Sequence, residues 1–562
     1  MSSRGDGAIS DGVLLAAIGG VVALGTMLWL WGGIAGAVFG SGWPSVGVGQ
    51  LLAVLIRLPS RLSNPAGAWP PAVRADLPGA GGFYAAFVVL AGAVAGAAVL
   101  GGRIGGRVMA GNGARWAKAP ELRPLRGFTR SRRPGRLVLG RHGGRLLYAE
   151  HRHALVAFGP PQSGKSAGIA IPALLDWAGP AVASSIKTDL LGSTIARRRA
   201  LGDVFVFDPF GLSGTRSHTW SPLRGASTWD GALEVAWRLA ASGELDQRGV
   251  EGGDFWAIAA EQRLAPLLYA AAADGRRIDS VVRWAYGQGG RELHETLGRL
   301  ADDAADDAQL ADAHAAYDAV RAFEAQADRT RSSIEATAQA LLRAYRFARV
   351  ARSAHSCEIT PDRLLDEDAT LYLIGDAKAS KLLRPIFLAL LSEIVERAYE
   401  RATLDGGRLG RPLLLCLDEA GNVAPLPNLA EIASTAPSHN IQLVSIFHDL
   451  AQARSRYGQQ AETVVNSHRA RMLLPGVADL ETLRYFAELV GDEEAPDRTR
   501  TTGSGGASRS IATRRRPLVA PEALRQLASE RALLLYGRVP PAELTLRMWF
   551  ADRRLRRLAT AT

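Results

Sequence analysis

The sequence predicts an α/β fold of the P-loop class, interrupted by an all-helical insertion and preceded by two membrane-spanning helices. Three observations support this prediction. A glycine-rich loop follows an apolar strand and precedes a helix, a later apolar strand ends in two carboxylates, and two long uncharged apolar runs lie within the first hundred or so residues.

The composition limits the class of protein before any motif is considered. A chain of 562 residues is too long for one core and predicts three or four structural units. The net charge of +11, from 66 basic and 55 acidic residues, permits an anionic partner such as nucleic acid or anionic lipid. With only two cysteines, Cys357 and Cys416, the chain cannot hold a disulfide framework or a cysteine metal cluster, and we expect two buried thiols in a reducing compartment.

Two apolar runs near the start, 12–40 and 83–102, contain no charged residue. Each is long enough to span a membrane, which takes about 20 apolar residues, and both are rich in Gly and Ala, as suits close helix packing in lipid. A cleaved signal peptide fits the first run poorly, because the run is too long for the apolar core of such a peptide. A buried helix of a soluble protein is the other alternative, but two such runs favour two membrane spans.

Basic residues set the expected orientation of these spans. Ten of them follow the second run, with Glu121 as the only acid among them: Arg103, Arg107, Arg115, Lys118, Arg123, Arg126, Arg130, Arg132, Arg133 and Arg136. The positive-inside rule places this flank in the cytoplasm, so we expect a multi-pass protein of the inner or plasma membrane with a cytoplasmic ATPase domain. The loop 41–82 would lie outside, with a short interfacial helix at 48–58. The flank could also contact anionic lipid or DNA, or serve only as a topology signal.

After residue 153 the chain alternates short apolar runs with helix-length segments. Six runs read as buried strands: 154–158, 181–186, 203–207, 370–374, 413–417 and 441–447. Continuous apolar runs of this length are typical of a mostly parallel sheet that is covered on both faces.

The remaining segments complete the predicted organisation. Between 229 and 360 the strands give way to Ala-rich helical sequence, which predicts an all-α insertion. The Gly/Ser/Arg stretch 497–516 reads as a flexible loop or linker, and 532–550 as a final hairpin before a basic tail. We therefore expect a membrane anchor at 1–110, an ATPase domain in two parts at 111–228 and 361–562, and the insertion at 229–360.

The glycine-rich loop fits the pattern G-x-x-x-x-G-K-[ST] completely, in the strand–loop–helix context that the motif requires. The predicted nucleotide-binding residues are Gly159, Pro160, Pro161, Gln162, Ser163, Gly164, Lys165, Ser166 and Ala167. The glycines allow the backbone N–H groups to face phosphates at a helix N-terminus. Lys165 should reach the β- and γ-phosphates of ATP, and Ser166 should bind Mg²⁺.

The segment 412–422 supplies the acidic strand that a P-loop requires. Its apolar residues lead to Asp418 and Glu419 at the carboxyl end, where open α/β sheets bind ligands. We expect Asp418 to hold the Mg²⁺ shell and Glu419 to polarise the attacking water. Two adjacent carboxylates favour hydrolysis of ATP over simple binding.

Several ordered motifs resemble one family. They are 112–125, the P-loop, "SSIKTDLLG", "FVFDPFG", "TWSPL", "DFWAIAAEQRLAPLLY", the long match at 417–458, "NSHRARMLLPGVADLETLRYFAELVG" and "PEALRQLASERALLLYGRVPP". The chain thus resembles the type IV coupling proteins, the VirD4/TraG-like DNA-transfer ATPases.

This resemblance implies a membrane-anchored motor of the RecA-like class with an all-α domain facing the cytoplasm. It further implies a homo-hexameric ring with nucleotide between subunits. The expected partners are DNA with an attached relaxase or other secreted protein, the components of a type IV secretion channel, and the membrane. Since no base-reading module is visible, we expect DNA contacts to be electrostatic and independent of sequence.

The chain also departs from the family pattern. After the second strand the family commonly has Asp-x-Lys-Gly-Glu, where this chain has Ser185-Ile186-Lys187-Thr188-Asp189. Pro437 stands where the family pattern predicts an arginine finger, which leaves Arg469 and Arg471 as candidates for a cation that acts across subunits.

Two further residues each admit two interpretations. His448 takes the place of a sensor glutamine, and we predict a catalytic role beside Lys165 and Glu419, with a charge that varies with pH; the alternative is a strand-end histidine without a role. Asp208 lies at the edge of the site or caps a turn.

Two rival functions remain open. One is a translocase of the FtsK type, which is the same class of motor with a different cargo. The other is a docking receptor for secreted proteins, in which ATP only controls assembly. The Arg-rich stretch 329–352 could face DNA or a relaxase, or form a solvated helix face.

Overall fold

The computed structural model describes residues 11–108, 113–127, 135–241, 253–503 and 506–560. These residues form two compact units, Met1–Asn112 and Gly113–Thr562. Of the basic residues used above for orientation, Arg130, Arg132 and Arg133 lie outside the described residues. The finer division into an anchor, a two-part ATPase domain and an insertion stays a prediction.

The first unit contains two long helices, α1 (Asp11–Phe39) and α3 (Ala80–Val108), with α2 (Val48–Arg57) and three 3₁₀ turns between them. The turns are η1 (Leu58–Arg61), η2 (Pro65–Ala68) and η3 (Pro71–Asp76). The windows Val22–Phe39 and Ala80–Ala97 are long and apolar enough to cross a membrane by length and composition. The predicted helices are therefore present in both apolar runs, and the interfacial place of α2 stays a prediction.

Aromatic side chains hold the two long helices together. Trp31 on α1 donates from Nε1 to the backbone oxygen of Phe83 on α3 at 2.7 Å. Gly32 lies against the fully buried Trp69, since a Cβ at this position would approach the indole to 2.8 Å. The small residue thus lets the segment between the two long helices pack closely against α1.

The second unit is built on an eleven-stranded sheet with the order β2-β1-β13-β12-β9-β3-β8-β7-β4-β6-β5. The stretch from β9 to β5 is parallel, and the other pairings are antiparallel. The strands are β1 (Val138–His142), β2 (Arg145–Tyr148), β3 (Leu155–Phe158), β4 (Ala181–Ser185), β5 (Val204–Phe207), β6 (Thr370–Ile374), β7 (Leu413–Leu417), β8 (Ile441–Phe447), β9 (Ala470–Leu473), β12 (Arg531–Tyr536) and β13 (Val539–Thr545). All six predicted strands and the final hairpin, β12–β13, are confirmed.

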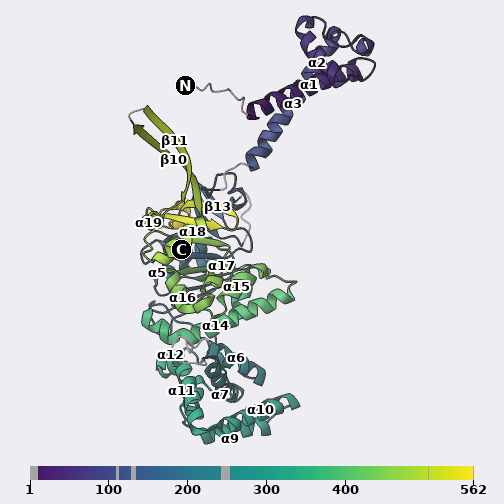
Figure 1. Cartoon of the computed structure of the whole chain (residues 1–562). Helices are drawn as coiled ribbons and strands as arrows, with labels where there is room; N and C mark the ends of the chain where they lie inside the picture. Colours follow the sequence, from purple (N-terminus) through teal and green to yellow (C-terminus); the bar gives the residue numbers. More distant parts are fainter. Residues whose placement is uncertain (1–10, 109–112, 128–134, 242–252, 504–505, 561–562) are drawn as a thin grey trace, which may run out of the picture. The chain divides into compact units, whose positions relative to one another are not determined.

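Helices accompany this sheet along the rest of the unit (Figure 1). They are α4 (Ile171–Asp176), α5 (Asp189–Arg199), α13 (Pro361–Asp366), α14 (Ala377–Leu404), α15 (Leu429–Thr435), α16 (Leu450–Tyr457), α17 (Ala461–Ser467), α18 (Leu480–Val490), α19 (Pro521–Arg525) and α20 (Arg553–Thr560). The parallel strands are buried along their length, which explains why they read as continuous apolar runs.

Between β5 and β6 the described residues contain helices and no strand. These helices are α6 (Trp229–Ala241), α7 (Gly253–Ala273), α8 (Ile278–Ala285), α9 (Gly290–Asp302), α10 (Asp307–Glu324), α11 (Asp328–Leu342) and α12 (Ala348–Arg352). They form the lower part of the unit in Figure 1. The helical character predicted for 229–360 is therefore confirmed within the described residues.

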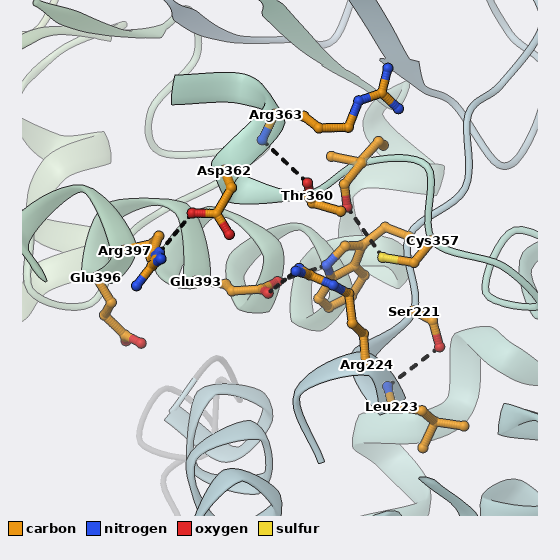
Figure 2. Close-up of polar contacts among 12 residues, drawn as sticks. Ser221, Leu223, Arg224, Cys357, Thr360, Asp362, Arg363, Glu393, Glu396 and Arg397 are labelled. Atoms are coloured by element: carbon orange, nitrogen blue, oxygen red, sulfur yellow. Dashed lines mark hydrogen bonds and ion pairs between the residues drawn. The ribbon is translucent and has the colours of Figure 1, made fainter. Parts of the chain in front are cut away.

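A polar joint connects α14 to the residues that flank the helical segment on either side (Figure 2). The buried Trp220 donates from Nε1 to Glu393 Oε2 at 2.8 Å, and Arg397 Nε pairs with Asp362 Oδ1 at 2.8 Å. Burial raises the pKa of Glu393, so the indole donor stabilises a carboxylate that is costly to bury. Cys357, beside this joint, is a free thiol that is only partly buried, whereas Cys416 is buried as predicted.

The prediction of a flexible linker at 497–516 is wrong. This stretch lies in a hairpin of two twelve-residue antiparallel strands, β10 (Asp492–Gly503) and β11 (Gly506–Pro517), which form a separate two-stranded sheet. The threonines along both strands favour extended backbone, and the pairing between the strands, not the Gly/Ser composition, sets the local structure.

Arg198, near the end of α5, is a fully buried cation. Its guanidinium donates to Thr370 Oγ1 at 2.6 Å, to the Trp177 carbonyl at 2.8 Å and to the Gly179 carbonyl at 2.6 Å. Burial lowers the pKa of Arg198 to about 10. These bonds fix α5 to the loop between α4 and β4 and to the start of β6.

We expect Arg198→Met to lower the free energy of unfolding by about 3 kcal/mol or more, because it leaves several buried acceptors unpaired. The neighbouring exposed Arg199 provides the control, since Arg199→Met should change stability by no more than about 0.5 kcal/mol. Unfolding of the detergent-solubilised full chain measures both. An equal effect of the two substitutions would contradict the role assigned to Arg198.

Candidate nucleotide-binding site

The glycine-rich loop joins β3 to a helical segment made of a π-helical turn (η5, Ser166–Ala170) and α4. The Gly159 N–H donates to the Phe447 carbonyl at 3.0 Å, which ties the start of the loop to the end of β8. Gln162 and Gly164 have φ values of 66° and 88°. A Cβ at Gly159 would collide with Ser163 Oγ. Only a glycine-rich sequence permits this tightly wound backbone at a helix N-terminus, where phosphates bind favourably.

The other predicted loop residues have different environments. Pro161 and Gln162 are exposed, and Ser163 is buried. The Pro160 carbonyl accepts from the Ser163 N–H at 3.2 Å, and the Ala167 carbonyl accepts from the Trp549 N–H at 3.0 Å. Ser163 Oγ is a buried polar atom without a hydrogen-bond partner among the described residues. The loop therefore contains a buried hydroxyl that a bound phosphate could hydrogen-bond.

Lys165 forms a buried ion pair with Glu419. Its Nζ lies 3.0 Å from Glu419 Oε1 and also donates to the Gly159 carbonyl at 3.3 Å. Both side chains are nearly excluded from solvent, at 6% exposure each. The parallel order β3-β8-β7 brings them together, because the carboxyl ends of β3 and β7 meet at one edge of the sheet.

Asp418 faces the first residue of the loop helix. Ser166 Oγ donates to Asp418 Oδ2 at 2.7 Å, while the buried Asp418 Oδ1 has no hydrogen-bond partner among the described residues. Burial raises the pKa of Asp418 to about 6, and the neighbouring Glu419 charge adds to this shift. A buried carboxylate with a free oxygen beside a hydroxyl fits Mg²⁺.

The described residues contain no group of three or more His, Cys, Asp or Glu side chains that could hold a metal ion by themselves. Mg²⁺ commonly binds through one or two protein oxygens together with substrate phosphates and water. Ser166 and Asp418 therefore fit this mode, in which the metal arrives with a nucleotide.

The backbone of Glu419 is strained and held in place. Its φ of 70° lies in the left-handed region, which is unfavourable for a non-glycine residue. The Asn422 N–H donates to the Glu419 carbonyl at 2.8 Å, and Asn422 Nδ2 donates to Glu419 Oε2 at 2.8 Å. His448 Nε2 lies 2.8 Å from the same oxygen. Asn422 thus holds both the backbone and the carboxylate of Glu419, and His448 holds the carboxylate from the end of β8.

Burial by itself would raise the pKa of Glu419, but the hydrogen bond from His448 and the charge of Lys165 outweigh it and lower this pKa to about 2. Glu419 is therefore ionised at neutral pH, and its charge is compensated inside the site. His448 contacts the carboxylate directly, so its position agrees with the predicted site and not with an isolated strand-end histidine.

The sequence analysis missed a supporting helix. Gln452 on α16 accepts from the His448 N–H at 2.7 Å through Oε1, and Arg456 Nε donates to the Gly421 carbonyl at 2.6 Å. A Cβ at Gly421 would lie 3.0 Å from the Gln452 side chain, so only glycine fits comfortably there. The i, i+4 spacing of Gln452 and Arg456, shortly after His448, was the available signal.

The segment after β13 also packs on the loop helix, which the sequence did not indicate. A Cβ at Gly164 would approach Met548 Cε to 2.6 Å. Next to Met548, the buried Arg547 forms ion pairs with Asp176, the last residue of α4, and with Asp552. The distance from Arg547 Nε to Asp552 Oδ2 is 2.8 Å. The residues that follow β13, which the sequence assigned to the final hairpin, are therefore anchored against the loop and its helix.

Other residues singled out from the sequence have hydrogen-bond partners outside the Lys165–Glu419 pair. Asp208 is buried and accepts from the Ser213 N–H at 2.6 Å, which supports its interpretation as a turn cap. Ser185 Oγ accepts from the Lys187 N–H at 3.2 Å at the end of β4. Arg471 donates to the carbonyls of Val465 and Asn466, both at 3.2 Å.

Comparison with known families gives one extended match. The family profile described as "Type IV secretory system Conjugative DNA transfer" matches residues 118–561. Among curated proteins, the conjugal transfer protein TraG of Escherichia coli is 24% identical over 458 residues, which cover 73% of this chain and 70% of TraG. The protein VirD4 of Rhizobium radiobacter is 22% identical over 460 residues, covering 79% of this chain and 64% of VirD4.

Solved structures give the same fold. The unbound bacterial conjugative coupling protein TrwBdeltaN70 superposes with a TM-score of 0.57 and 17% identity, over 78% of this chain and 93% of that chain. The plasmid coupling protein TrwB in complex with ADP and Mg²⁺ superposes with a TM-score of 0.56 and 16% identity, over 78% and 94% of the two chains. The predicted RecA-like P-loop fold is confirmed by this likeness.

We expect Arg547→Met to lower the free energy of unfolding by about 3–5 kcal/mol, because it removes a buried cation from two carboxylates. Arg554 pairs with the same Asp176 at 2.9 Å, but its side chain is 40% exposed. Arg554→Met should therefore cost no more than about 1 kcal/mol. Thermal unfolding of the solubilised full chain compares the two variants, and a similar cost for both would refute the anchoring role of Arg547.

Proposed function

Since the chain belongs to the type IV secretory system family of conjugative DNA transfer, we propose that it is a membrane-anchored coupling ATPase. It uses ATP hydrolysis to bring DNA, with an attached relaxase or other secreted protein, to a type IV secretion channel. The grouping of the buried Lys165, Asp418 and Glu419 with Ser166 at one sheet edge is the observation that carries this proposal.

Residues 159–167 hold the triphosphate of the substrate ATP. Ser166 and Asp418 hold Mg²⁺, which supplies charge neutralisation at the phosphates when bound. Lys165 exchanges its present partner, Glu419, for a phosphate oxygen. Glu419 then keeps the donors from His448 and Asn422 and accepts a proton from the attacking water. The complex of TrwB with ADP and Mg²⁺ supports this assignment by its fold and ligands.

The membrane attachment rests on α1 and α3 and on the basic flank that follows them. Two helices of sufficient length and apolarity, with this flank on the cytoplasmic side, support an inner-membrane protein whose ATPase domain lies in the cytoplasm. We further propose that subunits assemble as a homo-hexamer with nucleotide between them. A cation from a neighbouring subunit would then complete each site, and Pro437 leaves its identity open.

One rival function keeps specific support. In a docking receptor ATP would control assembly without driving movement, and the departures at Ser185 and Pro437 from the family pattern favour such a reduced use of ATP. Steady-state ATP turnover with and without DNA separates the two functions, since a motor is expected to turn over faster with DNA. Transfer of a mobilisable plasmid in a host that lacks this protein tests the cargo.

We expect Glu419→Gln to lower ATP turnover by about 100-fold or more, because an amide cannot accept the proton from water. Binding of a fluorescent ATP analogue should persist, since the loop and the metal ligands are unchanged. Glu431→Gln, an exposed substitution on α15, is the matched control. Turnover that responds neither to Glu419→Gln nor to DNA would rule out the motor.

We expect Lys165→Ala to abolish plasmid transfer while the protein remains in the membrane fraction, because the P-loop and the apolar helices lie in separate units. Fractionation of cells and a mating assay measure the two properties together. Lys378→Ala, at an exposed position on α14, should leave both unchanged. Release of the Lys165 variant from membranes would contradict the separation of anchor and motor.

A further inference from the structure

The residues 546–550, which follow β13, pass along the phosphate loop and the helix that the loop opens. A Cβ at Gly168 would lie 3.1 Å from Leu546 Cβ, and the Trp549 N–H donates to the Ala167 carbonyl at 3.0 Å. This segment therefore touches the first turn of the loop helix, directly after the predicted magnesium ligand.

Phe550, the last residue of this segment, remains half exposed. Its exposed fraction is 50%, whereas Met548 is buried at 7%. The ring of Phe550 lies edge-on to that of Trp549, with the centroids 6.2 Å apart and the planes at 79°. Single exposed apolar side chains are common on protein surfaces, so the exposure of Phe550 is informative only because of its place next to the loop.

Hydrogen bonds and ion pairs fix the turn that presents Phe550. The Asp552 N–H donates to the Met548 carbonyl at 3.0 Å. The Asp552 carboxylate pairs with Arg547, and also with Arg141 on β1 at 3.0 Å. A ring that is held in place before its ligand arrives binds that ligand at a lower entropic cost.

The directions of the strands place this turn at the same edge of the sheet as the loop. β13 pairs antiparallel with β12, and β12 pairs antiparallel with β9, which is parallel to β3. β13 therefore runs in the direction of β3 and ends at the edge where the loop begins. In the order of the sheet, β13 and β7 lie on opposite sides of β3.

This order indicates the direction in which a triphosphate would lie on the loop. The lysine of a P-loop reaches the β- and γ-phosphates, and the loop backbone holds the α- and β-phosphates. Lys165 lies against Glu419, which follows β7, so the γ-phosphate belongs on the β7 side of the loop. The α-phosphate and the nucleoside are then expected on the β13 side, toward Phe550.

We propose that the ring of Phe550 stacks on the base of the bound nucleoside triphosphate, while Trp549 fixes this ring from its edge. The inference rests on the proposed function, because it requires a triphosphate on the loop. Every base presents a π face to an aromatic ring, so the contact binds a purine nucleotide without distinguishing adenine from guanine. Phe550 is thus a binding residue that acts on the affinity for the nucleotide.

The test separates the base of the ligand from its phosphates. Calorimetry with the detergent-solubilised full chain and Mg²⁺ compares adenylyl imidodiphosphate, a non-hydrolysable ATP analogue, with inorganic tripolyphosphate, which has no base. We expect Phe550→Ala to weaken binding of the analogue about tenfold, as for the loss of one base–aromatic stack, and to leave binding of tripolyphosphate unchanged. The corresponding guanylyl analogue should be weakened equally, and Phe550→Tyr should retain binding of both analogues, since its ring can also stack.

Phe347→Ala is the matched control, because Phe347 is another phenylalanine of the second unit that is 47% exposed. This variant should bind the analogues and tripolyphosphate as the unsubstituted chain does. Undiminished binding of the analogues by the Phe550→Ala protein would overturn the proposal. So would an equal loss of tripolyphosphate binding, which would show that Phe550 only supports the loop. An unsubstituted chain that binds neither kind of ligand would overturn the proposed function as well, which distinguishes the two failures.

Discussion

Three buried ionisable groups at one edge of the parallel sheet, Lys165, Asp418 and Glu419, constrain the rest of the second unit. Burying a charge is costly unless a partner compensates it. Lys165 and Glu419 compensate each other at 3.0 Å, whereas Asp418 has only the hydroxyl of Ser166 and a pKa raised by burial. Asp418 is thus a buried carboxylate that lacks a cation of its own. A Mg²⁺ ion that arrives with ATP would supply that cation.

Keeping these groups in place requires support from distant parts of the chain. The strained backbone of Glu419 is held by Asn422, and its carboxylate by His448, which Gln452 on α16 fixes in turn. On the other side, the segment around Arg547 packs the end of the chain on the loop helix. A site that stores backbone strain persists only where the surroundings determine it this strongly.

The helical segment and the hairpin β10–β11 are both joined to helices that pack on the large sheet. The helical segment between β5 and β6 is joined to α14 through the buried bond from Trp220 to Glu393. The hairpin β10–β11 follows directly after α18, and the Leu450 N–H on α16 donates to Thr482 Oγ1 on that helix at 2.9 Å. The same helix, α16, therefore contacts both the turn that carries Glu419 and the element that carries the hairpin.

The sequence by itself determined the parallel strands, the phosphate loop and the carboxylates Asp418 and Glu419, because these depend on local patterns: apolar runs, glycine spacing and residues at strand ends. Only the tertiary structure decided which groups support them. Arg456 and Arg547 act through contacts with Gly421 and Asp176 that folding creates, and no local pattern encodes a partner so far away in the chain. The stretch 497–516 shows the same limit, since its Gly/Ser composition indicated a linker while cross-strand pairing made it a hairpin.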